Sequence, residues 1–160
     1  MTGCGISKRD GLDEWCLHTI VANHSPRAAD LLHRIVAVGE SLDPSVIPAT
    51  DLVHCDYHHR NVLVDRGRLV GVIDCEACQD GDRRFDLVTL AYWLGFVGAA
   101  PGVAEQLAEH VKALLPAELL LAYVAHMVLR NVDFYARTDR PEIADLHIAY
   151  GEELLGGLGV

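Results

Sequence analysis

The side chains best suited to chemistry lie between positions 54 and 74. The segment His54-Cys-Asp-Tyr-His-His-Arg-Asn61 places Asp56 and Asn61 in one loop, and Asp74 ends the β-branched run that follows. Two carboxylates and one amide are therefore expected at the same end of a hairpin. Such oxygen ligands suit a hard cation such as Mg²⁺, which takes one or two carboxylates together with phosphate oxygens and water.

A β-hairpin is needed to position these groups. Two short runs, residues 61–64 and 69–73, are rich in valine, leucine and isoleucine, and Asp65-Arg-Gly-Arg68 separates them with a glycine at the turn. This spacing predicts two antiparallel strands joined by a tight turn. We expect no other β structure in the chain.

Helical periodicity accounts for the remainder. Apolar residues from Leu12 to Ile20 predict a first helix, and Ser25 followed by Pro26 predicts the capped start of a second one that stops between Gly39 and Pro44. Four more helices are expected over residues 85–97, 101–115, 116–137 and 141–155. The fold class is therefore α+β, mainly α, with one hairpin and about six helices in a single domain over residues 1–160, of which 1–10 are expected to be disordered.

Composition and charge exclude some classes of function. With 13 basic and 23 acidic residues, the net charge of −10 argues against a nucleic-acid partner, because phosphate binding needs surplus Lys and Arg. Five cysteines without framework spacing, and no signal peptide, predict reduced thiols in the cytoplasm. The uncharged stretch from Leu87 to Ala104 predicts a buried helix, since Pro101 and Gly102 end it at about 14 residues, too short for a bilayer.

The order of these motifs resembles a known family. The pattern H-x-D-x-x-x-x-N, a strand, a turn, a strand ending in Ile-Asp, then G-D-x-x-x-D-L is similar to the catalytic half of the aminoglycoside phosphotransferase and choline kinase family. The positions that carry the resemblance are His54, Asp56, Asn61, Asp74, Gly81, Asp82, Asp86 and Leu87. The helices that follow also suit the C-terminal lobe of such a kinase.

The resemblance implies a role for each matching residue. Asp56 would accept the proton of the substrate hydroxyl, and Asn61 and Asp74 would bind Mg²⁺ at the phosphates of ATP. His54 would brace the loop, and Asp86 would hold its backbone in place. The implied activity is ATP-dependent phosphotransfer to a hydroxyl of a small molecule, of a kind associated with antibiotic resistance.

Two positions and one whole region depart from the family pattern. Cys55 stands where glycine is usual, and Cys75 where a bulky aromatic residue is usual. Only 53 residues precede His54 and they read as helices, so the N-terminal lobe with its glycine-rich loop and strand-borne lysine is expected to be absent. We therefore expect weak ATP binding and impaired turnover. The alternative is a non-catalytic remnant or the partner-binding half of a split kinase, and homodimerisation through a bared apolar face is also open.

The sequence does not identify the molecule that accepts the phosphate, nor does it assign a single role to the basic residues near the site. Asp133 and Glu142 on the late helices are candidates for binding a cationic substrate, although acidic residues on helices more often form a solvated face. Arg60, Arg83 and Arg84 are the basic residues near the site. One of them could contact phosphate, or they could form salt bridges with Asp80, Asp82 or Asp86.

Zinc is the rival interpretation of the same region. Potential ligands crowd the loop and the strand end, and two of the cysteines have C-x-x-C spacing: His54, Cys55, His58, His59, Cys75 and Cys78. The residues between the paired cysteines lack the glycine-bearing turn of zinc knuckles, so magnesium chemistry is favoured over a structural zinc site.

Overall fold

The computed structural model describes residues 16–99, 102–138 and 140–160. Contacts divide the chain into two units, a hairpin unit of Pro44–Pro116 and a helical unit that joins the chain up to Asp43 to Ala117–Val160. The predicted single domain over residues 1–160 stays a prediction. The expected disorder of residues 1–10 lies outside the described residues.

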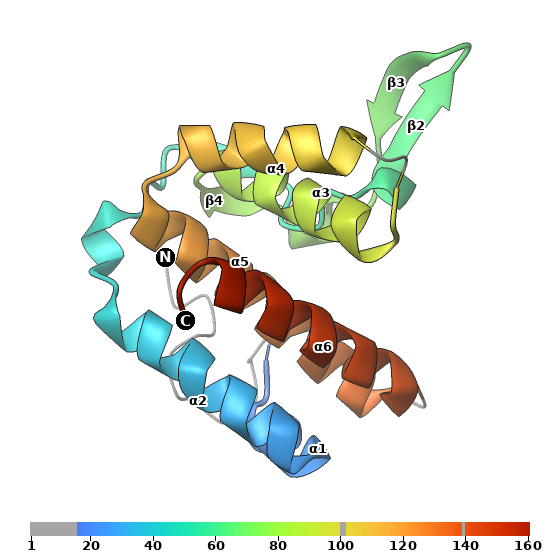
Figure 1. Ribbon diagram of the computed structural model, residues 1–160. Coiled ribbons are helices and arrows are strands. Elements are labelled where there is room, and N and C mark those ends of the chain that lie inside the picture. Colours follow the sequence, from blue (N-terminus) through green and yellow to red (C-terminus); the bar gives the residue numbers. More distant parts are fainter. Residues whose placement is uncertain (1–15, 100–101, 139) are drawn as a thin grey trace. The chain divides into compact units, whose positions relative to one another are not determined.

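The hairpin unit contains the predicted hairpin. Strands β2 (Val62–Asp65) and β3 (Arg68–Val72) pair antiparallel, with a register shift between Leu63 and Val64 (Figure 1). The turn residues Arg66 and Gly67 both have positive φ angles, 49° and 74°. Two such residues in succession suit the mirror-image turns that match the twist of the two strands, and glycine adopts this conformation without steric strain.

A second pair of strands contradicts the expectation of a single β element. Strands β1 (Asp51–Val53) and β4 (Gln79–Gly81) pair antiparallel and frame the loop and hairpin between them. Each has three residues, and Gln79-Asp-Gly81 has none of the β-branched residues that favour strands. This pairing forms because the chain returns to its starting point, a long-range effect that local pattern cannot report.

Helices follow the strands in the hairpin unit. Helix α3 (Arg84–Phe96) packs against α4 (Val103–Leu114) and buries Phe85, Val88 and Tyr92. Both bounds of α3 agree with the predicted helix to within one residue, while Pro101 lies outside the described residues.

Of the helices that the structure describes, none has the length and apolar character required to cross a membrane. Short 3₁₀ turns, η1 (Pro44–Val46), η2 (His59–Asn61) and η3 (Cys75–Ala77), complete this unit.

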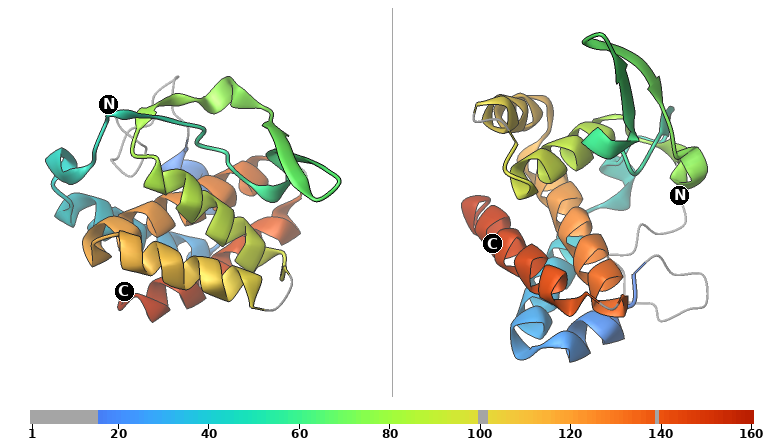
Figure 2. Two further views of the ribbon diagram at one scale, coloured as in Figure 1. Left: turned by 90° about the horizontal axis from the view of Figure 1, so that it is seen from above. Right: turned by 90° about the vertical axis from the view of Figure 1, so that its right-hand side faces the viewer.

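The helical unit consists of four helices in the described residues: α1 (His18–His24), α2 (Pro26–Ser41), α5 (Ala117–Arg137) and α6 (Pro141–Gly157). Ser25 caps α2 as predicted, because its hydroxyl accepts a hydrogen bond from the backbone N–H of Ala28 at 3.1 Å. Helices α5 and α6 run side by side (Figure 2). A Cβ added at Gly151 would lie 2.4 Å from Val128, so glycine permits this close approach.

The predicted fold class is confirmed, with six α-helices and the predicted hairpin in the described residues. The first helix is shifted from its predicted position. It begins at His18 and ends at His24, whereas the apolar spacing suggested residues 12–20. The core of the helical unit is formed by large aliphatic side chains that are almost fully buried, namely Leu31, Ile35, Leu119, Met127, Leu129, Ile148 and Leu155.

Candidate active site

The loop that begins at His54 is held by one carboxylate. The two oxygens of Asp86, in the first turn of α3, accept hydrogen bonds from the backbone N–H groups of His54 and Cys55, both at 2.9 Å. Partial burial raises the pKa of Asp86, and these two hydrogen bonds act in the opposite direction. A residue 31 positions downstream therefore fixes the backbone that carries the candidate catalytic aspartate.

His54 links this loop to the end of the hairpin. Its Nδ1 accepts a hydrogen bond from the backbone N–H of Asp56 at 3.3 Å, and its Nε2 lies 2.9 Å from the carbonyl oxygen of Ile73. Because Nδ1 serves as the acceptor, Nε2 carries the proton and donates to Ile73. The buried imidazole thus spans from the residue before Asp74 to the backbone of Asp56.

Asp56 and Asn61 are joined by a side-chain amide. The Nδ2 atom of Asn61 donates to the backbone oxygen of Asp56 at 3.0 Å and lies 3.4 Å from a carboxylate oxygen of Asp56. This use of the amide nitrogen leaves the amide oxygen of Asn61 as the atom that could bind a metal ion. The Asp56 carboxylate keeps 26% of its side chain exposed, with His58 Nε2 at 3.5 Å, so a substrate hydroxyl can reach it.

Asp74 lies directly beyond the last hydrogen bond of the hairpin. The backbone N–H of Ile73 donates to the carbonyl oxygen of Asn61 at 3.0 Å, which brings the strand end beside the loop. Asp74 is exposed and has a φ of 65°, in the left-handed region. The backbone of Asn61 is therefore one hydrogen bond away from the residue that precedes Asp74. The predicted convergence of the Asp56, Asn61 and Asp74 side chains on one metal ion stays a prediction.

This donor set fits magnesium better than zinc. Two carboxylates and an amide oxygen are hard ligands, and Mg²⁺ retains several waters and phosphate oxygens in addition to such groups. Among residues 16–99, 102–138 and 140–160, no three His, Cys, Asp or Glu side chains are arranged to hold a metal ion by themselves. The zinc alternative therefore lacks the closed ligand cluster that a structural zinc requires.

Comparison with known proteins gives the family. A model described as the phosphotransferase enzyme family (APH) matches residues 6–122. The chain belongs to this family. A 63-residue segment is 33% identical to hygromycin-B 4-O-kinase of Escherichia coli, covering 36% of this chain and 18% of that protein. The apo crystal structure of a thermostable mutant of aminoglycoside phosphotransferase APH(4)-Ia matches with a TM-score of 0.65 and 22% identity over 86% of this chain and 46% of that chain.

The two matched relatives are longer than this chain, which spans less than half of either one. The structural match shows the fold that the sequence predicted, part of a phosphotransferase of this kind. The catalytic and metal-binding roles of individual residues are not tested by it and stay predictions.

Cys55 occupies the family's glycine position at a structural cost. Its φ is 64°, a conformation that disfavours residues with a Cβ. The residue is only 6% exposed, and its sulfur accepts a hydrogen bond from Nε2 of Gln79 at 3.3 Å. The departure noted in the sequence is therefore a backbone strain offset by local packing, directly beside Asp56.

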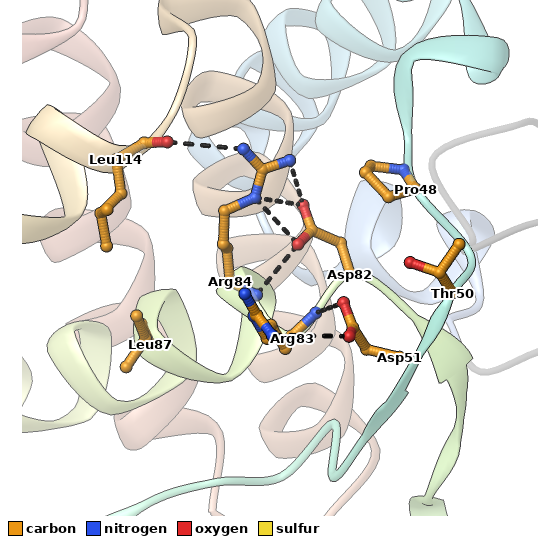
Figure 3. Close-up of a pocket in the computed structure, with 8 residues that line it drawn as sticks. All are labelled: Pro48, Thr50, Asp51, Asp82, Arg83, Arg84, Leu87 and Leu114. Carbon is orange, nitrogen blue, oxygen red and sulfur yellow. Dashed lines mark hydrogen bonds and ion pairs between the residues drawn. The ribbon is translucent and has the colours of Figure 1, made fainter.

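The arginines at the start of α3 form salt bridges. Nε and Nη2 of Arg84 bind the buried carboxylate of Asp82 at 2.8 to 2.9 Å, and Arg83 lies 3.8 Å from Asp51. These contacts line an open pocket of about 540 Å³ whose wall also includes Pro48 (Figure 3). Sequence reasoning did not find this pocket, because β1 and the end of α4 contribute to it. The predicted salt bridge to Asp82 is observed for Arg84, whereas Arg83 lies near Asp51, which was not among the expected partners. A contact with phosphate stays a prediction.

The two substrate candidates belong to the helical unit. Asp133 is fully buried; it accepts a hydrogen bond from the backbone N–H of Leu17 at 3.0 Å and forms an ion pair with Arg137. Glu142 is exposed and lies 4.0 Å from Arg140. Substrate binding by either residue stays a prediction, and the enclosure of Asp133 favours a supporting role for it.

Proposed function

We propose that this chain forms the catalytic half of a Mg²⁺- and ATP-dependent phosphotransferase that acts on a hydroxyl of a small molecule. The observation that carries the proposal is the hydrogen-bonded connection between the Asp56 loop and the end of β3. Asn61 binds Asp56 through its side chain and Ile73 through its backbone. One residue thus relates the candidate base to the candidate metal ligand Asp74.

Each residue has a defined part in this reaction. Asp56, partly exposed, accepts the proton of the attacking hydroxyl. The amide oxygen of Asn61 and the carboxylate of Asp74 would hold Mg²⁺, which supplies positive charge to the phosphate oxygens when bound. His54 and Asp86 act as positioning residues, since both bind the backbone of the loop rather than any reacting group.

The proposed acceptor is a cationic small molecule such as an aminoglycoside. The net charge of −10 favours a cationic partner over an anionic one. The printed names of the two relatives, hygromycin-B 4-O-kinase and an aminoglycoside phosphotransferase, support an aminoglycoside acceptor. We propose a role in antibiotic resistance and a cytoplasmic location together with that acceptor. Asp133 and Glu142 remain the residues we propose to test for substrate binding.

A second candidate function follows from the exposed hairpin. Large apolar side chains on its strands are more than half exposed, namely Val64 (62%), Leu69 (59%) and Val70 (61%). In the described part of the chain, the lysine at position 112 lies on α4 rather than on a strand. We propose that ATP affinity is weak without a β-rich nucleotide-binding part covering this surface. The alternative function is that the chain binds such a nucleotide-binding part but does not itself catalyse phosphotransfer.

Transfer of labelled phosphate from ATP to hygromycin B tests the proposal, with Mg²⁺–ATP binding measured separately by calorimetry. Asp56→Asn should lower the transfer rate by about 10² to 10⁴-fold while leaving Mg²⁺–ATP binding in place. Asp74→Asn should weaken that binding. Asp65→Asn, an exposed aspartate at the tip of the same hairpin, is the matched control and should behave as wild type.

Each outcome separates the candidates. Binding of Mg²⁺–ATP without transfer to any alcohol, both with and without an added nucleotide-binding lobe, would favour the partner-binding alternative. Transfer that survives Asp56→Asn unchanged would refute the assignment of the base.

A further inference from the structure

Two cysteines enclose the short 3₁₀ turn that follows Asp74. Cys75 begins η3 and Cys78 directly follows it, with β4 starting at Gln79. The backbone N–H of Cys78 donates to the carbonyl oxygen of Cys75 at 3.1 Å, so the two residues face each other across one tight turn. None of the roles proposed for phosphotransfer uses either sulfur.

The geometry of this turn suits a disulfide. A turn closed by a hydrogen bond between residues i and i+3 keeps their Cα atoms within about 7 Å, and disulfides span about 4.4 to 6.8 Å between Cα atoms. The 3.1 Å backbone hydrogen bond between Cys78 and Cys75 places this pair within that range. Closing the bond therefore requires side-chain rotation and not a rearrangement of the strands.

The other two described cysteines are less accessible to an oxidant than this pair. Cys55 is buried and its sulfur is bonded to Gln79, and Cys16 is buried in the helical unit. Cys75 is exposed, whereas Cys78 is only partly accessible. An oxidant from solution therefore meets Cys75 first, and Cys78 is placed to resolve the product.

We propose that Cys75 and Cys78 form a redox-active dithiol that small disulfides such as oxidised glutathione convert to an intramolecular disulfide. The thiolate of Cys75 attacks one sulfur of glutathione disulfide, forming a mixed disulfide and releasing one glutathione. The thiolate of Cys78 then attacks the Cys75 sulfur and releases the second glutathione. Two protein thiols are oxidised, one glutathione disulfide is reduced to two thiols, and two protons are transferred from the protein to the products.

The position of the pair couples it to the candidate metal site. Cys75 is bonded directly to Asp74, so a ring closed through η3 restrains the backbone next to that carboxylate. Oxidation is therefore expected to weaken Mg²⁺–ATP binding several-fold. This consequence rests on the proposed function, whereas the thiol chemistry does not depend on it.

Mass spectrometry of the full chain tests the pair. The assay uses a Cys4→Ser background, because Cys4 lies outside the described residues, and oxidised glutathione as the probe. The expected product is a Cys75–Cys78 cross-link that lacks two hydrogens and is reversed by dithiothreitol. In Cys78→Ser, a glutathione adduct should accumulate on Cys75; in Cys75→Ser, adduct formation on Cys78 should be at least about tenfold slower, because Cys78 is less accessible.

Several results would overturn the inference. They are cross-linking that appears only after the protein is unfolded in urea, a disulfide that uses Cys55 instead, or equal adduct rates on the two single variants. Circular dichroism of each variant establishes that it is folded. Calorimetry with Mg²⁺–ATP then compares reduced and oxidised protein, and equal affinities with the cross-link present would remove the coupling to Asp74 without affecting the test of phosphotransfer itself.

Discussion

The helical unit and the hairpin unit each place one buried or partly buried aspartate against a backbone segment, with different partners. Asp133 in the helical unit pairs with the guanidinium of Arg137 and one backbone N–H, that of Leu17. Asp86 in the hairpin unit receives two backbone N–H groups, from His54 and Cys55. Burial raises the pKa of both carboxyl groups. One carboxylate is thus part of an ion pair that closes a helix bundle, and the other shapes a loop.

The distribution of apolar burial follows the same division. Side chains such as Leu31, Met127 and Leu129 are almost fully buried in the helical unit, whereas Val64 and Leu69 on the hairpin are more than half exposed. Hydrophobic burial is the dominant favourable contribution to folding. We infer that the helical unit supplies most of the stability and that polar contacts hold the site in the hairpin unit.

The largest difference between the two units should appear in the pH dependence of their stability, because a fall in pH should destabilise the helical unit. Burial lowers the pKa of His126 and His147, both in the helical unit, from 6.5 to about 4, with Arg130 adding to the effect at His126. Each folded-state pKa is depressed, so the unfolded chain binds more protons between pH 6.5 and 4. The stability that neutral histidines contribute is present above pH 6.5 and is lost as the pH falls. From pH 7 to pH 5 the loss should be about 2 kcal/mol per histidine, about 4 kcal/mol together.

Urea unfolding followed by circular dichroism at the two pH values measures this loss. His147→Phe, which retains an aromatic ring to stack on Tyr135, should halve the pH dependence. Substitution of the exposed His33 is the control. If the free energy of unfolding of His147→Phe changes with pH as much as that of wild type, the acid sensitivity of the helical unit does not come from this residue.

Asp133→Ala should be the next largest perturbation. The change leaves Arg137 without its carboxylate and the N–H of Leu17 without its acceptor in a fully buried site. Removing one partner of a buried ion pair costs about 3 kcal/mol or more. Thermal and urea unfolding measure the loss, and Glu142→Ala, an exposed acidic residue of the same unit, is the control. A loss below about 1 kcal/mol would place Asp133 outside the structural core and return it to the substrate candidates.

The parts of the fold that depend on residues close in sequence could be predicted from local pattern. The Ser25 cap, the hairpin turn at Gly67 and the start of α6 at Pro141 each follow from residues close in sequence. The β1–β4 pairing does not, because Val53 and its partner Gln79 are 26 positions apart and neither strand has a local signal for the other. The first helix also differs from its local pattern, and the residue that precedes it, Leu17, donates its backbone N–H to Asp133, 116 positions away.

The candidate site shows the same limit. Its members could be named from motif spacing, and the proximity of Asn61 to the end of β3 follows from the hairpin. The hydrogen bond between Asn61 and the backbone of Asp56, and the tautomer of His54, depend on side-chain placement that spacing does not specify. The pocket beside Arg84 had no local signal, because its wall combines β1, α3 and α4.

Asp86→Asn should have a smaller effect on stability and a clear one on activity. An amide oxygen can accept one of the two backbone N–H bonds, but its NH₂ group then faces the other donor. We expect a loss of about 2 kcal/mol in the hairpin unit. Trp93 fluorescence in a Trp15→Phe background reports it, because Trp93 lies on α3. Phosphotransfer should fall at least about tenfold, through kcat more than KM, because the loop that carries Asp56 loses its anchor.

The pH dependence of Asp86 has the opposite sign to that of the histidines. Its folded-state pKa is raised above the usual 3.8, so the associated stability is present below that value and is lost as the pH rises through the folded-state pKa. Asp86→Asn should remove this contribution, and Asp65→Asn should retain it. If Asp86→Asn unfolds like wild type and reacts at the same rate, the loop is held by other contacts and the division between the units fails.

The smallest expected effect is the difference in stability between two substitutions of Cys55. The sign of this difference tests the conformation of the loop. In an ordinary helix such as α5, glycine is about 1 kcal/mol less stable than alanine. At a φ of 64° a Cβ is itself unfavourable, so Cys55→Gly should be more stable than Cys55→Ala by about 1 kcal/mol, although it removes more of the side chain. Ala125→Gly, at a fully buried position of α5, is the control and should show the usual order. Trp93 fluorescence for the first pair and circular dichroism for the second measure the difference. An alanine variant as stable as the glycine variant would mean that Asp86 does not hold residue 55 in a left-handed conformation in solution, and the loop around Asp56 would then be shaped by packing of the sulfur against Gln79.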